Sequence, residues 1–365
     1  VTSSYLEGIC NEMADWGYNR DKKRGKKQIV IGLLCDGQGE PVSVEVFTGN
    51  TPDPQTFGAQ VQKVAERFGC HTVTFVGDRG MIKSAQVKDL AKSGFHYITA
   101  ITKPQIRSLI KKGVFQLELF DEQLCEIQDS GVRYVLRRNP VRAKEMAASR
   151  ASKLAALQAL AAEQNLYLAE HPRADEYKAW KKVSEKDSKL RLSSIVTVTA
   201  DDRHINVDVD TEYMAYLAEL DGCYVIKSDL PDEKADKEII HDRYKDLAMV
   251  ETAFRTCKTT HLEVRPVFVR TEASTRGHVL VVMLAYLIVR ALKKAWEDVD
   301  LTVEEGLKEL DKICAMNLSV NGGDACLRIP EPSSTVRELL DALDVKLPQF
   351  LPKSKAKVDT KRKLH

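Results

Sequence analysis

Two acidic residues, one at the end of an expected strand and one within an expected helix, are the side chains best suited to chemistry in this chain of 365 residues. Asp78 ends a run of β-branched and aromatic residues, and Glu251 lies among good helix formers. Carboxylate oxygens are the ligands that Mg²⁺ prefers, and metal ions held this way can assist phosphodiester cleavage. Each residue also has a simpler interpretation, because an Asp before Arg-Gly often forms a turn and charged residues on helices are usually solvated.

Residues 244–258 are expected to form one helix, because they combine good helix formers with an apolar stripe and contain neither Gly nor Pro. At 100° per residue, five side chains of this helix fall within about 80° of one another. They are Tyr244, Leu247, Glu251, Arg255 and Lys258. A carboxylate would then lie between an aromatic ring and two cations on one helical face, unless the face is an ordinary solvated stripe.

The spacing of Tyr244, Glu251 and Lys258 resembles the Tyr-Arg-Glu-Lys signature around the third catalytic carboxylate of DDE insertion-sequence transposases. The text VETAFRTCKTTHLEVRPVF is similar to one branch of that family. Leu247 stands where the family has its Arg, and Arg255 on the same face would substitute in part. The resemblance implies that Asp78 and Glu251 are catalytic ligands of two Mg²⁺ or Mn²⁺ ions, and that Tyr244, Lys258 and Arg255 contact DNA.

The start of the chain also resembles this family. The family's first catalytic Asp lies in a strand with a pattern like Tyr-Asp-x-Thr-Ser, directly before the position of Val1, so by that match the chain starts one residue too late. Residues 17–21 resemble the family's Gly-Tyr-Ser-Lys-Asp turn. The basic residues in and after this turn would contact phosphate or form a solvated loop. They are Arg20, Lys22, Lys23, Arg24, Lys26 and Lys27.

The first hundred residues predict three strands, a helix, a strand, a helix and a strand. The strands are expected at residues 1–6, 28–36, 41–50, 71–78 and 95–101, and the helices at 51–68 and 84–93. The second strand is apolar nearly throughout and is therefore expected to be central. This is the order of the ribonuclease-H-like fold, so we expect an α/β (α+β) protein with a mixed sheet and flanking helices. In that fold the end of the fourth strand places Asp78 in the active-site cleft.

Residues 102–219 leave that order and are interpreted as an insertion subdomain, with sheet strands stopping near Ile101 and resuming near Cys223. Short strands are expected at residues 113–120 and 131–139, a helix at 141–170 and a strand-turn-strand at 193–210. The basic residues near the start of the long helix would follow a DNA backbone or be solvated. They are Arg137, Arg138, Arg142, Lys144, Arg150 and Lys153.

The remaining residues predict a strand at 262–271, a core helix at 278–296 and two further helices at 302–318 and 333–343. The apolar run in the core helix is shorter than the ~20 residues that span a bilayer, so no membrane segment is expected. The predicted organisation has five parts. They are the first part of the catalytic core (1–101), an insertion (102–219), the second part of the catalytic core (220–298), a small helical part (299–352) and a basic disordered tail (353–365).

Composition excludes several classes of protein. The 55 Lys and Arg nearly balance the 53 Asp and Glu, so net charge indicates nothing about nucleic acid. Eight scattered cysteines without a Cys-x-x-Cys pair fit reduced thiols in a cytosol, and no structural metal is expected. The sequence has no Gly-x-Ser-x-Gly, P-loop or Gly-x-Gly-x-x-Gly motif, so serine hydrolases, nucleotide hydrolases and dinucleotide oxidoreductases lack their required parts.

The resemblance implies a DNA transposase that cleaves and transfers strands at transposon ends in a bacterial or archaeal cytoplasm, close to the nucleoid. Its implied partners are the terminal inverted repeats, target DNA and a second copy of the chain, with no membrane. Two alternatives stay open. One is another ribonuclease-H-like nuclease. The other is a non-catalytic DNA-binding remnant, which Leu247 and the missing first Asp favour.

Overall fold

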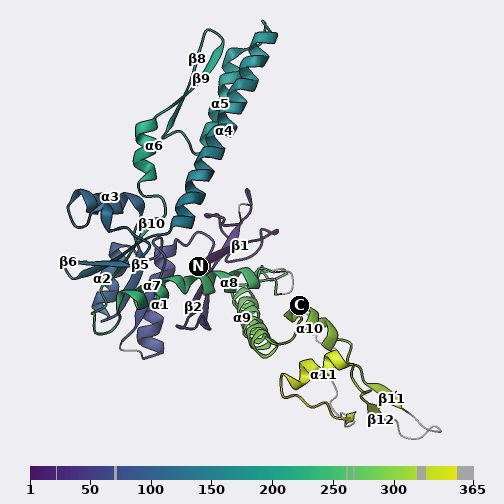
Figure 1. The fold of residues 1–365 in the computed structure, drawn as a ribbon. Coiled ribbons are helices and arrows are strands. Elements are labelled where there is room, and N and C mark those ends of the chain that lie inside the picture. Colours follow the sequence, from purple (N-terminus) through teal and green to yellow (C-terminus); the bar gives the residue numbers. More distant parts are fainter. Residues whose placement is uncertain (22, 70–71, 260–261, 266–267, 319–325, 352–365) are drawn as a thin grey trace. The chain divides into compact units, whose positions relative to one another are not determined.

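The computed structural model describes residues 1–351 except 22, 70–71, 260–261, 266–267 and 319–325. The chain divides into two compact units (Figure 1). Unit 1 comprises Val1–Asp36, Glu40–Asn50 and Glu251–His365, and unit 2 comprises Gly37–Gly39 and Thr51–Val250. Each unit has its own sheet and its own buried core.

The sheet of unit 1 is antiparallel, with β2 (Gln28–Cys35) between β1 (Thr2–Tyr5) and β3 (Pro41–Thr48). The first five residues of β2 are buried, which confirms the prediction that this apolar strand is central. The helix α9 (Glu272–Ala295) packs on β3. Its Val279 and Val282 join a core that also holds Ala253 of α8 (Leu247–Cys257).

The end of unit 1 is a small α/β part. Its elements are α10 (Val303–Leu310), β11 (Met316–Leu318), β12 (Cys326–Arg328), α11 (Ser334–Asp341) and β13 (Phe350–Leu351). The helix predicted at 302–318 is therefore wrong beyond Leu310. The helix after Ser333 is confirmed, and the Ser333 hydroxyl caps it by accepting from the Val336 amide at 3.3 Å. The predicted tail, residues 353–365, lies outside the described residues.

Unit 2 contains a mixed five-stranded sheet in the order β4-β5-β10-β7-β6. Its strands are β4 (Thr74–Val76), β5 (His96–Ala100), β6 (Cys125–Asp129), β7 (Val132–Arg138) and β10 (Cys223–Ser228). Only the β4 and β5 pair is parallel, and the other neighbours are antiparallel. The helices of this part are α1 (Asp53–Arg67), α2 (Ser84–Lys92), α3 (Lys103–Lys111) and α7 (Lys237–Lys245). Together the two sheets and their helices form the predicted α/β, ribonuclease-H-like fold.

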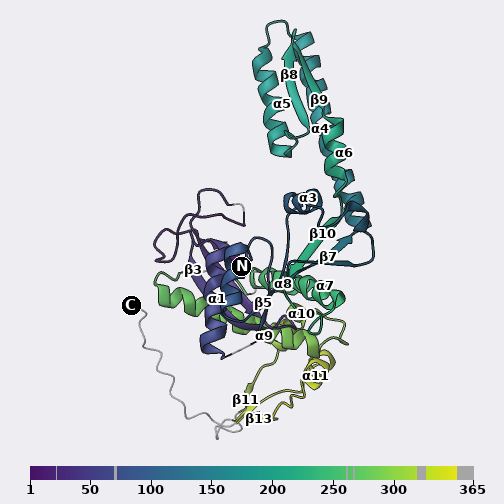
Figure 2. The same cartoon turned by 90° about the vertical axis from the view of Figure 1, so that its left-hand side faces the viewer.

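Between β7 and β10 the chain forms a helical arm with its own core, shown in Figures 1 and 2. The arm consists of α4 (Pro140–Glu170), α5 (Glu176–Leu190), β8 (Val196–Asp201), β9 (His204–Val209) and α6 (Thr211–Ala218). The hairpin of β8 and β9 lies along the paired helices α4 and α5 and forms a separate two-stranded sheet. The predicted helix at 141–170 and the strand-turn-strand at 193–210 are confirmed.

Two expectations for residues 102–139 are wrong. Residues between Ile101 and Cys223 do contribute strands to the sheet, because β7 pairs with β10 along six residues and β6 pairs with β7. The strand expected at 113–120 is replaced by a short 3₁₀ helix, Leu117–Leu119. Phe115 and Phe120 are both buried, and residues five apart in a strand would face opposite sides. The chain must therefore turn between them. The five-part division remains a prediction.

The helix predicted at 244–258 is interrupted. It forms the end of α7 and the whole of α8, with Asp246 between them. The amide of Met249 bonds to the Asp246 carbonyl, three residues back, so the i to i−4 ladder of one continuous helix is broken there. The strand predicted at 262–271 is also absent from the described residues of that range. Glu263 and Phe268 have φ of 40° and 63°, which no extended strand adopts.

The predicted core helix is α9, and it is buried on one side only. Val279, Val282 and Tyr286 are buried, whereas Val281 and Ile288 are more than half exposed. Among the described residues, α9 is the one helix whose length and apolar composition would suffice to cross a membrane. Length and composition alone are weak evidence, because the core helix of a soluble protein passes the same test.

The contact between Gly306 and Trp296 predicts an unusual sensitivity to one methyl group. A Cβ added at Gly306 would lie 2.6 Å from the Trp296 ring, whereas a Cβ at Gly277 in α9 would meet nothing within 4 Å. We expect Gly306→Ala to lower the free energy of unfolding by about 1–3 kcal/mol. Gly277→Ala should leave it unchanged or raise it by up to about 1 kcal/mol. Urea denaturation measures both, and equal effects would contradict the packing described.

Candidate active site and DNA-binding surface

Asp78 lies two residues beyond β4 and starts a turn. Its Oδ1 accepts hydrogen bonds from the amides of Gly80 at 2.7 Å and Met81 at 3.0 Å. Asp78 therefore does form a turn, but the turn uses only Oδ1 of its carboxylate. The residues that the structure describes donate no hydrogen bond to Oδ2, and Asp78 is exposed. The fold thus leaves one oxygen of Asp78 for a cation.

Glu251 is exposed on α8, on the side away from the core. Ala253 and Cys257, one turn apart, are buried, whereas Glu251 and Arg255, also one turn apart, are exposed. Among the described residues neither charged group has an ion-pair partner. Burial raises the pKa of the Cys257 thiol to about 11, so this cysteine is a packing residue and not a nucleophile.

Tyr244 does not share a helix with Glu251. It lies in α7 and packs, partly buried, against a core cluster of unit 2 that contains Ile98, Ile226 and Ile240. The expected single face carrying Tyr244, Glu251 and Lys258 is therefore wrong, because the break at Asp246 separates α7 from α8. The contact of Tyr244 with DNA stays a prediction.

Lys258 follows the last residue of α8 and joins two other segments of unit 1. Its Nζ donates to the Ser3 carbonyl in β1 at 2.8 Å and to Asp21 Oδ1 at 2.7 Å. The fully buried Ser3 also accepts, through Oγ, the amide of Arg20 at 3.0 Å. An ammonium group has three donors, so one N–H of Lys258 remains beyond these two contacts.

Further cations gather around Tyr5 of β1. Lys23 lies 5.8 Å and Arg265 lies 4.9 Å from the centre of its ring, and Arg265 Nη1 donates to its hydroxyl at 2.6 Å. Lys26 pairs with Glu7 at 2.7 Å, and this contact lowers the pKa of Glu7. The predicted basic loop is thus anchored beside β1, although Lys22 lies outside the described residues.

Sequence reasoning missed the parts of this surface that are distant along the chain. Arg265 contacts Tyr5 across 260 positions, and no local pattern marks either residue as a partner of the other. Asp21 belongs to the turn that resembles the family, but its pairing with Lys258 spans 237 positions. Only the folded chain brings these groups together.

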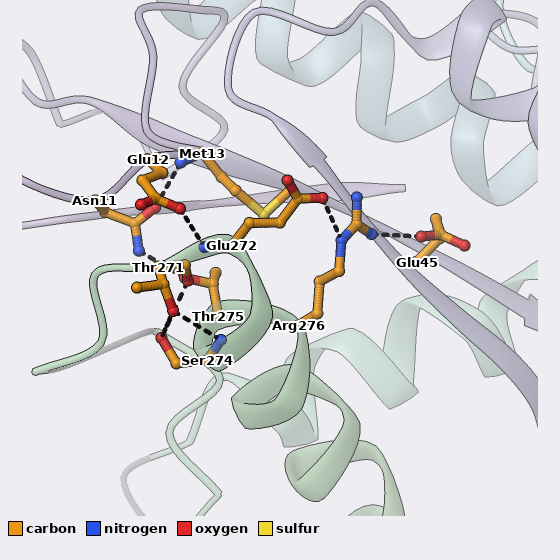
Figure 3. A network of polar contacts seen from close by, with 9 residues as sticks. All are labelled: Asn11, Glu12, Met13, Glu45, Thr271, Glu272, Ser274, Thr275 and Arg276. Atoms are coloured by element: carbon orange, nitrogen blue, oxygen red, sulfur yellow. Dashed lines mark hydrogen bonds and ion pairs between the residues drawn. The ribbon is translucent and has the colours of Figure 1, made fainter. Parts of the chain in front are cut away.

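A second polar network, drawn in Figure 3, attaches the start of α9 to the segment after β1. Asn11 Nδ2 donates to Thr275 Oγ1 at 2.7 Å, and both residues are buried. Glu12 accepts the amide of Glu272 at 2.7 Å. Arg276 then bonds to Glu272 and to Glu45 of β3. These contacts attach α9 to β3 and to the segment after β1, and no sequence motif indicated them.

The residues present fit a divalent metal in the type of their donor atoms. Asp78 and Glu251 offer hard carboxylate oxygens that the fold does not use, as Mg²⁺ and Mn²⁺ require. The described part of the chain contains no group of three His, Cys, Asp or Glu side chains placed to hold an ion. Asp78 belongs to unit 2 and Glu251 to unit 1, so their sharing of a metal is a proposal.

Comparison with known families places most of the chain in one family. The model of the transposase DDE domain matches residues 2–288, a range that contains Asp78, Glu251 and Lys258. No curated protein matches the chain. Because the family match extends over most of the chain, from β1 into α9, the protein belongs to the family of transposases with a DDE domain.

Proposed function

We propose that this protein is the catalytic core of a DNA transposase in which Asp78 and Glu251 hold two Mg²⁺ or Mn²⁺ ions for strand cleavage and transfer. The family implies DNA as substrate and typically uses divalent metal ions. The observation that carries the proposal is that the family match contains both carboxylates and that the fold leaves oxygens of both free for ligation. The DNA would be transposon terminal inverted repeats and a target.

The residues of the chain would prepare the site in three ways. The turn amides of Gly80 and Met81 orient Asp78, and the buried face of α8 orients Glu251. Lys258, held by Ser3, is a compact charge suited to a phosphate near the scissile bond. Divalent ions, when bound, activate water or a DNA 3′-hydroxyl and stabilise the attacking and leaving oxygens of the in-line displacement.

The surface beside β1 would hold the DNA backbone. Arg20 and Lys23 lie in the loop that Ser3 anchors, and Arg265 adds a cation that sequence analysis did not identify. Arg255 lies on the same exposed side of α8 as Glu251, and it would compensate in part for Leu247. We further propose that two copies act together on DNA, in the cytoplasm of a bacterial or archaeal cell and near its nucleoid.

A second candidate function is DNA binding without catalysis. Leu247 replaces the signature Arg, and the described residues contain no three-ligand metal group. Binding of DNA by Lys258 and the loop at β1 requires neither feature. The two candidates therefore differ in metal binding and in strand cleavage.

A shared metal site predicts that Fe²⁺ and ascorbate will cut the polypeptide in two places. Radicals formed at a bound iron attack the nearest backbone, so we expect cuts near residue 78 and near residue 251. Asp78→Asn or Glu251→Gln should abolish both cuts, because each ion would lose a ligand. Asp89→Asn, which alters an exposed carboxylate of α2, should change neither.

Cutting at one position alone, or cuts that survive in either ligand variant, would contradict the shared site. Mg²⁺-dependent nicking of plasmid DNA that disappears in both variants would support catalysis. Binding of the same DNA without nicking and without specific Fe²⁺ cuts would favour the second candidate.

The pairing of Lys258 with Asp21 predicts opposite effects of two substitutions. Lys258→Gln removes a phosphate contact, so the slope of log K against log salt should become less steep, by at most about 0.9 because Asp21 already neutralises part of this charge. Asp21→Asn removes a negative charge beside the same ammonium group and keeps an oxygen that accepts its hydrogen bond, so DNA affinity should rise. Fluorescence anisotropy with labelled duplex DNA measures both. A fall in affinity for Asp21→Asn, with an unchanged melting temperature, would show that Asp21 is needed to place Lys258.

A further inference from the structure

Two hollows in the described part of unit 2 have linings of opposite charge. The larger, of about 840 Å³, is mostly acidic. Its charged lining is Glu118, Asp121, Glu126, Asp232, Asp236 and Glu238 with Arg133 and Lys237. The smaller, of about 320 Å³, lies where α4 begins, α5 ends and α6 returns, and we call it the arm pocket. A polyanion would be repelled by the first hollow and attracted by the second.

The charged lining of the arm pocket is four cations and one acid. These residues are Arg142, Arg150, Lys153, Arg191 and Glu145, a formal sum of +3 from four minus one. Arg142 is paired with Glu145 at 2.7 Å. Lys153 and Arg191 have no ion-pair partner among the residues that the structure describes. Two cations are therefore available to an anionic ligand.

A third cation is fixed in place by a buried carboxylate. Both oxygens of Asp221 accept from Arg150 Nη2, at 2.8 and 2.6 Å, and Asp221 is 4% exposed. Lys103 Nζ lies 3.5 Å from the same carboxylate, so one negative charge is shared by two cations. Arg150 is thus held rigid while positive charge remains in excess, which favours binding of an anion without ordering a long side chain.

The lining of the pocket suits a nucleic-acid backbone. Leu192 and Ile195 line it and are buried members of the arm's core. Ser149 and Ser194 add hydroxyl donors to the lining. A lining that combines apolar side chains with cations and hydroxyls accommodates deoxyribose and phosphate together.

Arg191 has a backbone conformation that favours Gly. It follows α5 with φ of 59° and ψ of 45°, the left-handed region in which helix ends usually place Gly. An Arg there is strained, and no ion pair among the described residues compensates the strain. Strain of this kind is an observation from which a functional role can be inferred. The role consistent with the pocket is that of a cation in its lining.

We propose that the arm pocket binds the phosphodiester backbone of DNA, with Lys153 and Arg191 contacting phosphate oxygens and Arg150 supporting them. This inference rests on the proposed function, because it assumes that the protein acts on DNA. It adds a second contact region, in unit 2, to the surface beside β1 in unit 1. DNA held there would contact the protein through backbone positions without base readout.

The test compares two variants of the arm that each lose two positive charges. In the pocket variant, Lys153→Gln and Arg191→Gln remove two lining cations. In the control, Lys178→Gln and Lys181→Gln remove two exposed cations of α5 that do not line the pocket. Anisotropy of a fluorescein-labelled random duplex is measured over a series of NaCl concentrations. The pocket variant should lower the salt slope by about 1.8, which is 0.9 for each lost contact, and the control should change it little.

Arg191→Gly separates a binding role from a structural one. Gly relieves the left-handed strain, so the melting temperature should equal or exceed that of the wild type. DNA affinity should nevertheless fall as it does in Arg191→Gln. A lower melting temperature with unchanged DNA binding would overturn the proposal, and so would a pocket variant that behaves like its control. If the wild type shows no salt-dependent DNA binding, the proposed function itself fails.

Discussion

The ammonium group of Lys258 is the contact on which the arrangement of unit 1 depends most. It joins the end of α8 to the buried backbone of β1 and to the loop at Asp21. A cation this close to a core needs partners, and a carbonyl and a carboxylate supply them. Because the contact anchors the C-terminal end of α8 to β1, it also holds the helix that carries Glu251. The Asn11 and Thr275 network anchors α9 to the segment after the same strand.

The charges of this protein are arranged locally, which explains why its net charge of +2 gave no indication of nucleic acid. Around β1 the cations have partners within the fold: Asp21 for Lys258, Glu7 for Lys26 and Tyr5 for Arg265. A phosphate would therefore share or displace these partners, and fewer counterions would be released than the number of cations suggests. In the arm pocket, Lys153 and Arg191 have no ion-pair partner among the described residues, so their full charge can act on a phosphate.

Patterns within a few residues predicted most strands and helices, because burial periodicity and turn residues act locally. The strands β1 to β3, the helix α4 and the hairpin of β8 and β9 follow from such patterns. Local patterns do not predict the break at Asp246 or the 3₁₀ turn between Phe115 and Phe120, since packing decides them.

The residues of the candidate site likewise differ in how far local patterns predict them. A resemblance to the family signature suggested Lys258 and Glu251, but no spacing rule connects Lys258 to Ser3 across 255 positions.

The arm is inserted between two strands that are hydrogen-bonded neighbours, and this determines how it is held. Arg138 at the end of β7 faces Cys223 at the start of β10, so both connections leave the sheet at the same point. The amide of Asn139 donates to the Gly222 carbonyl at 2.9 Å, and Gly222, at a φ of 76°, has no room for a Cβ beside Asn139. Asp221 then ties this junction to Arg150 of α4. A helix of 31 residues extends about 46 Å at 1.5 Å per residue. These contacts fix the first turns of α4 to the ends of β7 and β10. DNA bound at the arm pocket would therefore be held in a fixed position relative to these two strands.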